Sequence, residues 1–207
     1  MIPFDQLKRR DVLTLLGGAA AAWPLAARAQ QAKLPTIGVL GPTSASAWGP
    51  WTTAFAKRLR ELGWIEGRTV AIEYRWADGR DERFAEIAAE FVRLKVDVIV
   101  TSGGAALAAK RATSVIPIVF AVANDPVGSG LVASLAHPGG NVTGLSNQTS
   151  DLAGKRLELL REVVPILRRL AIMANVGYPP AVLEMKEIQE TTRALGLEAA
   201  TLEIRRA

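Results

Sequence analysis

The sequence VDVIVTSGG at residues 96–104 determines the fold that we expect for this chain. Its first part is a short apolar run, and such a run predicts a strand that is buried on both faces, as in a parallel sheet. The TSGG segment then predicts a polar turn, and the alanine-rich stretch after it predicts a helix. A buried strand, a turn and a helix together make one βα unit.

The same unit recurs on both sides of this stretch. Apolar runs predict five strands, at residues 34–41, 70–74, 96–100, 116–122 and 142–145. Helices are predicted between them, with an apolar face of Trp51, Phe55, Leu59 and Leu62, with a cap at Asp81, after residue 104, and at 131–136. This alternation predicts an α/β fold, a doubly wound parallel sheet with right-handed crossovers.

A shorter series of elements follows residue 150. It consists of a helix at 151–163, a strand at 170–175, a helix at 180–195 and a strand at 197–204. We therefore expect a first lobe at 30–150 and, at 151–207, a crossover helix with a partial second lobe. A free-standing sheet of two strands is marginally stable at best.

The first 29 residues have the pattern of an export signal. Lys8, Arg9 and Arg10 precede an apolar run at 13–25, and Ala27-Arg28-Ala29 follows it. This pattern predicts a signal peptide at 1–29, cleavage near Ala29 and a periplasmic protein. The adjacent arginines resemble a twin-arginine signal, and a general secretory signal that happens to hold two arginines is the alternative.

Composition and motifs exclude several classes of function. The formal net charge of +5 is scattered along the chain, whereas nucleic-acid binding needs a clustered basic face. The chain has no cysteine, and its single histidine, His137, is expected to be a capping or surface residue. The sequence contains no phosphate-binding loop, nucleophile elbow or metal-ligand spacing. We therefore expect no enzyme, no cofactor and no metal.

Polar side chains follow the predicted strands where each strand ends. Ligands of doubly wound sheets bind at this edge, so we expect binding residues there. They are Thr43, Ser44, Thr101, Ser102, Asn124 and Asp125, with Trp48 flanking the ligand. Hydroxyls suit a carboxylate and an aspartate suits an ammonium group, which together suit an amino acid. The alternatives are helix caps for Thr43, Ser44 and Thr101, a plain turn at 124–126, and a core or lobe-surface position for Trp48.

Five stretches of the chain are similar to one known family. They are 37–43, 60–68, 98–104, 118–127 and 137–146. In these stretches the chain resembles the ABC transporter substrate-binding proteins that are related to tryptophan- and tyrosine-binding lipoproteins. The resemblance runs from about residue 34 to the end of the chain.

The resemblance implies a periplasmic-binding-protein fold in which two α/β lobes hold a solute between them. It implies a small solute such as an aromatic or other amino acid, delivered to an ABC permease and its ATPase in the inner membrane. By position, Asn175 faces the residues of the first lobe. The chain lacks the lipobox cysteine, which implies no stable membrane insertion after cleavage. The alternatives are a truncated or non-functional fragment and a ligand-sensing partner of a membrane receptor.

Overall fold

The structure is a computed structural model that describes residues 33–147 and 152–205. All of the elements below lie in one unit, which spans Pro35–Ala207. The predicted signal peptide at 1–29 and the start of the predicted helix at Asp151 lie outside the described residues.

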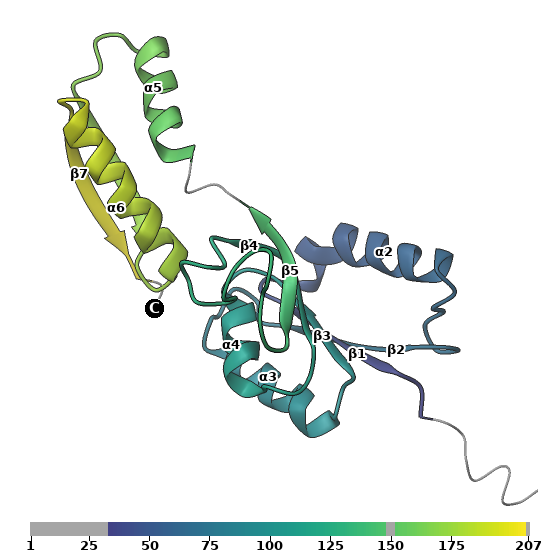
Figure 1. The fold of residues 1–207 in the computed structure, drawn as a ribbon. Coiled ribbons are helices and arrows are strands. Elements are labelled where there is room, and N and C mark those ends of the chain that lie inside the picture. Colours follow the sequence, from purple (N-terminus) through teal and green to yellow (C-terminus); the bar gives the residue numbers. More distant parts are fainter. Residues whose placement is uncertain (1–32, 148–151, 206–207) are drawn as a thin grey trace, which may run out of the picture. The chain divides into compact units, whose positions relative to one another are not determined.

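Five parallel strands form the first sheet (Figure 1). They are β1 at Thr36–Gly41, β2 at Ala71–Trp76, β3 at Val98–Thr101, β4 at Ile118–Asn124 and β5 at Val142–Asn147. Their order in the sheet is β2-β1-β3-β4-β5. The predicted α/β fold with a doubly wound parallel sheet is therefore confirmed.

Three helices connect the first four strands. They are α2 at Ala45–Glu61, α3 at Arg83–Leu94 and α4 at Gly104–Ala112. Helices α3 and α4 pack against each other and against one face of the sheet (Figure 1). The chain moves from β1 to β2 in one direction and from β2 to β3 and β4 in the other. Right-handed crossovers therefore put α2 on the opposite face.

The main core lies between the sheet and the pair α3 and α4. Its fully buried members include Leu40, Phe91, Ile99, Ile118 and three alanines of α4, Ala105, Ala106 and Ala109. Small alanine side chains let α4 lie close to its neighbours. Gly38 of β1 does the same for α3, because a Cβ there would lie 2.8 Å from the ring of Phe91.

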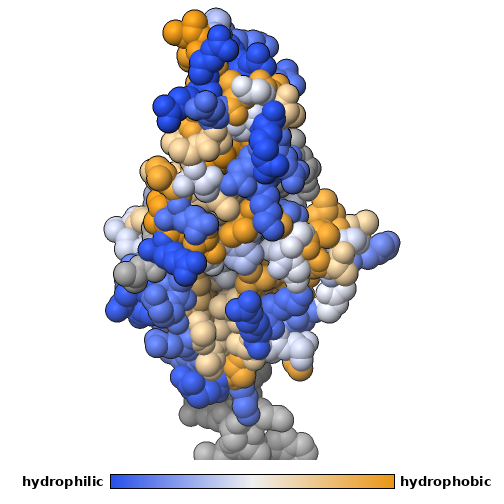
Figure 2. Space-filling model, turned by 90° about the vertical axis from the view of Figure 1, so that its left-hand side faces the viewer, coloured by the Kyte–Doolittle hydropathy of each residue, from blue (hydrophilic) through white to orange (hydrophobic). Residues whose placement is uncertain are grey.

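The face of the sheet toward α2 is only partly covered. Val98 and Val100 are half-buried there, although Ile99 on the other face is fully buried. Leu145 of β5 is 72% exposed. The expected burial of the third strand on both faces is thus met on one face alone. Apolar side chains reach the surface in several places, and Figure 2 shows such patches between hydrophilic ones on one side of the molecule.

Helix α2 turns a different face inward from the predicted one. Trp51 is 71% exposed and Leu62 is 59% exposed, so the predicted apolar face was wrong at both ends. The half-buried positions include Trp48, Thr52, Phe55 and Leu59, which recur at helical spacing. The indole of Trp48 packs on that of Trp76, and this contact selects the face that the periodicity left ambiguous.

Two further local predictions were wrong. No helix forms at 131–136, where the described chain bends without regular secondary structure. The amides of Leu131 and Val132 both donate to the carbonyl of Pro126, which anchors the turns and leaves both side chains buried. Asp81 does not cap α3, whose N-cap is Glu82 and has no side-chain capping hydrogen bond.

A second sheet of two parallel strands follows residue 152. Its elements are α5 at Ala153–Val163, β6 at Arg169–Asn175, α6 at Pro179–Ala194 and β7 at Glu198–Ile204. Helix α6 packs on Ile172 and Ala174 of β6 through Met185. The other face stays open, since Met173 is 68% exposed and every residue of β7 is exposed. Among the described helices, none is long and apolar enough to cross a membrane.

The close packing of Phe91 under Gly38 predicts the effect of adding one methyl group. We expect Gly38→Ala to lower the free energy of unfolding by about 1–3 kcal/mol, because the ring must shift within a packed core. Urea unfolding followed by tryptophan fluorescence measures this change.

Gly104→Ala is the matched control. A Cβ at Gly104 meets its nearest side-chain atom, Cδ2 of Tyr178, at 3.6 Å, which is an ordinary contact. Its stability should therefore stay close to that of the unmodified chain. Equal destabilisation by both substitutions would show that the contact of Gly38 with Phe91 is not the cause.

Candidate functional site

The strand order places a crevice at the carboxyl ends of β1 and β3. Strand β1 pairs with β2 on one side and with β3 on the other. The chain leaves β1 for α2 on one face of the sheet and leaves β3 for α4 on the other. The loops after Gly41 and Thr101 therefore diverge, and such a switch in strand order is where open α/β sheets bind ligands.

The start of α2 positions an indole at this crevice. Ser44 is the N-cap of the helix, and its hydroxyl accepts a hydrogen bond from the amide of Ala47 at 3.3 Å. Trp48 follows in the first turn and packs against Trp76, with ring centroids 6.1 Å apart and the rings inclined by 64°. Gly41 allows this arrangement, because a Cβ there would overlap the ring of Trp76.

A pocket of about 450 Å³ opens beside Trp48. It is lined by Trp48, Trp51, Ser102, Ala121 and Val122. Its volume falls within the range of about 300–1,000 Å³ that is typical of small-molecule sites. Two indoles and two aliphatic side chains make it mainly apolar, and Ser102 adds one hydroxyl. Ser102 is only 8% exposed, and within the described residues no hydrogen bond to its hydroxyl is found.

The pocket brings together two residues that the sequence singled out, Trp48 and Ser102. Trp51 was instead assigned to the core, although its spacing of three from Trp48 puts both indoles on one side of the helix. The two aliphatic lining residues belong to β4 and carried no signal in the sequence, because any buried strand contains such residues.

Three other hydroxyl candidates lie close to these pocket residues. Thr101 is fully buried, and its hydroxyl donates to the carbonyl of Leu40 at 2.9 Å. This bond satisfies a buried acceptor at the point where β1 and β3 diverge. Ser44 caps α2, and Thr43 is exposed in the loop before it. The capping alternative thus describes Ser44, and a ligand contact by any of the three stays a prediction.

Asn124 and Asp125 form the turn at the end of β4. Asp125 has a φ of 38°, and its carboxylate accepts a hydrogen bond from the amide of Gly128 at 2.8 Å. The backbone of Asn124 is hydrogen-bonded to the hydroxyl of Tyr178, whose pKa is raised mainly by burial. The turn alternative therefore describes Asp125, and its contact with an ammonium group stays a prediction.

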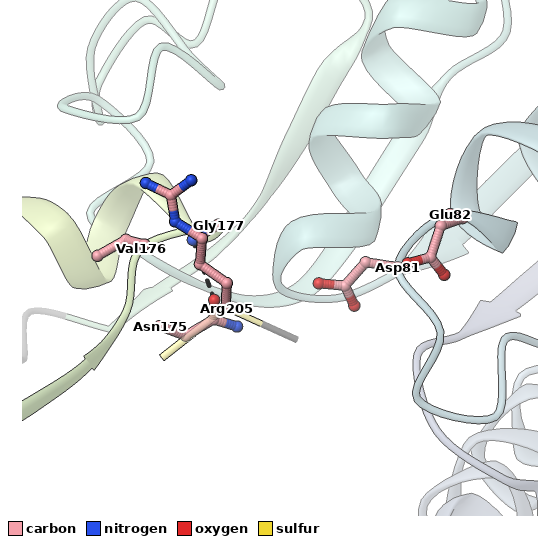
Figure 3. Close-up of a pocket in the computed structure, with 6 residues that line it drawn as sticks. All are labelled: Asp81, Glu82, Asn175, Val176, Gly177 and Arg205. Atoms are coloured by element: carbon pink, nitrogen blue, oxygen red, sulfur yellow. Dashed lines mark hydrogen bonds between the residues drawn. The ribbon is translucent and has the colours of Figure 1, made fainter. Parts of the chain in front are cut away.

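Asn175 lies at a different hollow, of about 500 Å³ (Figure 3). The lining residues are Asp81, Glu82, Asn175, Val176, Gly177 and Arg205. The side-chain oxygen of Asn175 accepts from the amide of Gly177 at 3.0 Å, so the residue also shapes its own turn. Asn175 does not line the pocket beside Trp48. Nothing in the sequence pattern pointed to Arg205, which follows the last strand.

Comparison with known proteins identifies relatives of this chain. The family model of ABC transporter substrate binding proteins matches residues 36–207. Among curated proteins, the tyrosine-binding protein of Clostridioides difficile is 33% identical over 137 residues, which cover 66% of this chain and 39% of that protein.

Solved structures share the fold. A conserved domain protein of Vibrio cholerae is 29% identical, with a TM-score of 0.73. The ABC domain from Streptococcus pneumoniae in complex with L-Trp is 25% identical, with a TM-score of 0.71. Each match covers 83% of this chain and 58% of the solved one. The chain therefore spans less than two thirds of the length of each of these relatives.

The turn at Asp125 predicts different effects for two substitutions. We expect Asp125→Ala to cost about 1–2 kcal/mol of stability, because alanine cannot accept from Gly128 and tolerates a left-handed backbone poorly. Asp125→Asn keeps an acceptor and suits that backbone, so it should stay within about 0.5 kcal/mol of the unmodified chain. Urea unfolding of both variants checks this. A large loss in Asp125→Asn would mean that the charge, rather than the turn, is what stability requires.

Proposed function

The chain belongs to the ABC transporter substrate-binding protein family, and on that basis we propose that it binds a small solute with an aromatic ring in the pocket beside Trp48. The observation that carries this proposal is the pairing of two indoles with the hydroxyl of Ser102, which forms no hydrogen bond within the described residues, at the switch in strand order.

The chemistry of the pocket favours an aromatic amino acid. Trp48 is held edge-on by Trp76, so its indole is already in place before a ligand arrives. Trp51 presents an exposed indole to the same pocket, and a ligand ring that covers it removes apolar surface from water. The hydroxyl of Ser102 donates to the carboxylate of the ligand, as a charge-assisted hydrogen bond.

The relatives support the same class of solute. One of them is a tyrosine-binding protein, and another was solved in complex with L-Trp. In our proposal the chain delivers its solute to an ABC permease and its ATPase in the inner membrane. The composition of residues 1–29 supports export, cleavage near Ala29 and a periplasmic location.

Thr43, Ser44, Thr101, Asn124, Asp125 and Asn175 stay predicted binding residues in this proposal, although Asn175 lines a different hollow from the pocket beside Trp48. In the first five, the side chains that already form internal hydrogen bonds shape the loops near the pocket. Ser44 holds the start of α2, and Thr101 holds the end of β1 beside Ser102. Their contribution to affinity is therefore indirect.

A solute panel tests the proposal. Tryptophan, tyrosine and phenylalanine should each raise the melting temperature of the purified chain and change its tryptophan fluorescence, because a ligand that binds only the folded state stabilises it. Leucine and glutamate should have a much smaller effect. If no aromatic amino acid stabilises the chain, the proposed solute class is wrong.

Trp51 offers the sharpest variant, since an exposed side chain contributes little to folding. Trp51→Ala should raise the Kd for the best aromatic solute about tenfold, which corresponds to about 1.4 kcal/mol. Trp64→Ala is the matched control, because Trp64 is also partly exposed but does not line the pocket. Affinities are measured by calorimetry. Equal affinities of the two variants would show that the solute does not bind against this face of α2.

A further inference from the structure

A second hollow on the five-stranded part has a different chemistry. It lies between α2 and β2, has a volume of about 400 Å³ and shares no lining residue with the pocket beside Trp48. Its lining consists of Thr52, Thr53, Ala56, Lys57, Arg60 and Tyr74. Five of these six side chains are polar, two are cationic and none is acidic.

The two cations come from one face of α2. Thr53, Lys57 and Arg60 follow one another at helical spacing, so their side chains lie along one face of the helix. The neighbouring Arg58 is paired with Glu61 at 2.9 Å. Within the described residues, neither Lys57 nor Arg60 forms an ion pair. Two like charges three residues apart repel each other, so an anion between them would relieve that repulsion.

The opposite wall adds a fixed donor. Tyr74 is half-buried, and its ring stacks on Trp76 with a centroid distance of 6.2 Å and an angle of 10°. Burial raises the pKa of the Tyr74 hydroxyl, and the charge of Glu66 raises that pKa further. The phenol therefore keeps its proton at neutral pH and can donate it in a hydrogen bond.

The hydroxyls of the two threonines differ in what they can do. That of Thr52 already donates to the carbonyls of Trp48 and Gly49, at 3.2 and 3.1 Å. That of Thr53 has no hydrogen-bond partner within the described residues. The donors that face the hollow are therefore an ammonium, a guanidinium, a phenol and one hydroxyl. Glu66 is an acidic group near this hollow. Its negative charge raises the pKa of Tyr74, and the same charge repels an anion bound there.

We propose that this hollow is a second binding site, separate from the solute pocket, which takes a small anion with several oxygen atoms, such as a phosphate or a carboxylate. Ammonium and guanidinium groups form short, strong hydrogen bonds with such oxygens. Lys57 supplies a point charge, while Arg60 can bind two oxygens at once. The stack of Tyr74 on Trp76 holds the phenol in place.

The test is a titration of the purified chain with sodium phosphate at low ionic strength, followed by NMR or calorimetry. Sodium chloride of equal ionic strength is the blank. The signal change on adding phosphate must exceed the change that chloride causes through ionic screening alone. We expect saturable binding of phosphate and weaker saturable binding of acetate. The double variant Lys57→Gln with Arg60→Gln should raise the Kd for phosphate at least about tenfold.

The double variant Arg168→Gln with Arg193→Gln is the control. It lowers the net charge by the same two units at exposed positions outside the hollow and should leave phosphate affinity unchanged. Equal loss in both double variants would show only a general charge effect and would overturn the proposal. So would a response to chloride equal to that to phosphate. Trp51→Ala should not affect phosphate binding, so this test is independent of the solute pocket.

Discussion

The packing of Phe91 beneath Gly38 sets the distance between α3 and the sheet. No side chain stands on β1 at this position, so the ring reaches the strand itself and is fully buried. Helix α4 follows with three fully buried alanines and packs closely beside α3. Both helices are thereby fixed on one face, and α2 takes the other. The divergence of the loops after β1 and β3, which forms the pocket, depends on this division.

The sparse cover on the α2 face gives the pocket its chemistry. None of the residues of α2 is fully buried, so the helix does not seal the sheet beneath it. Trp48 finds a partner in Trp76, while Trp51 stays exposed beside Val122 of β4. Exposed apolar surface costs about 25 cal/mol per Å² relative to burial. A ligand that covers these indoles recovers that free energy, which is why the incomplete packing favours binding.

Much of the fold could be predicted from local patterns. Apolar runs located all five strands of the first sheet, since a buried parallel strand needs nothing but apolar residues and a turn. The predictions failed where contacts between residues distant in sequence determine the local structure. Leu131 and Leu135 have helical spacing, yet Pro126 accepts two amides and holds turns there instead. On α2, the periodicity allowed two faces, and only the contact with Trp76 selects Trp48 over Trp51.

The candidate site shows a similar limit for a different reason. Strand ends can be read from sequence, and so Trp48 and Ser102 could be assigned to one edge. The sequence does not distinguish a polar side chain that hydrogen-bonds within its own loop from one whose polar atoms stay available for a ligand. The hydroxyl of Thr101 donates to the carbonyl of Leu40, and the carboxylate of Asp125 accepts from the amide of Gly128. The hydroxyl of Ser102 has no such partner within the described residues, although the residue is nearly buried. Among the described residues no buried side-chain oxygen or nitrogen lacks a hydrogen-bond partner, so this unpaired hydroxyl is reached by solvent and is free to donate to a ligand.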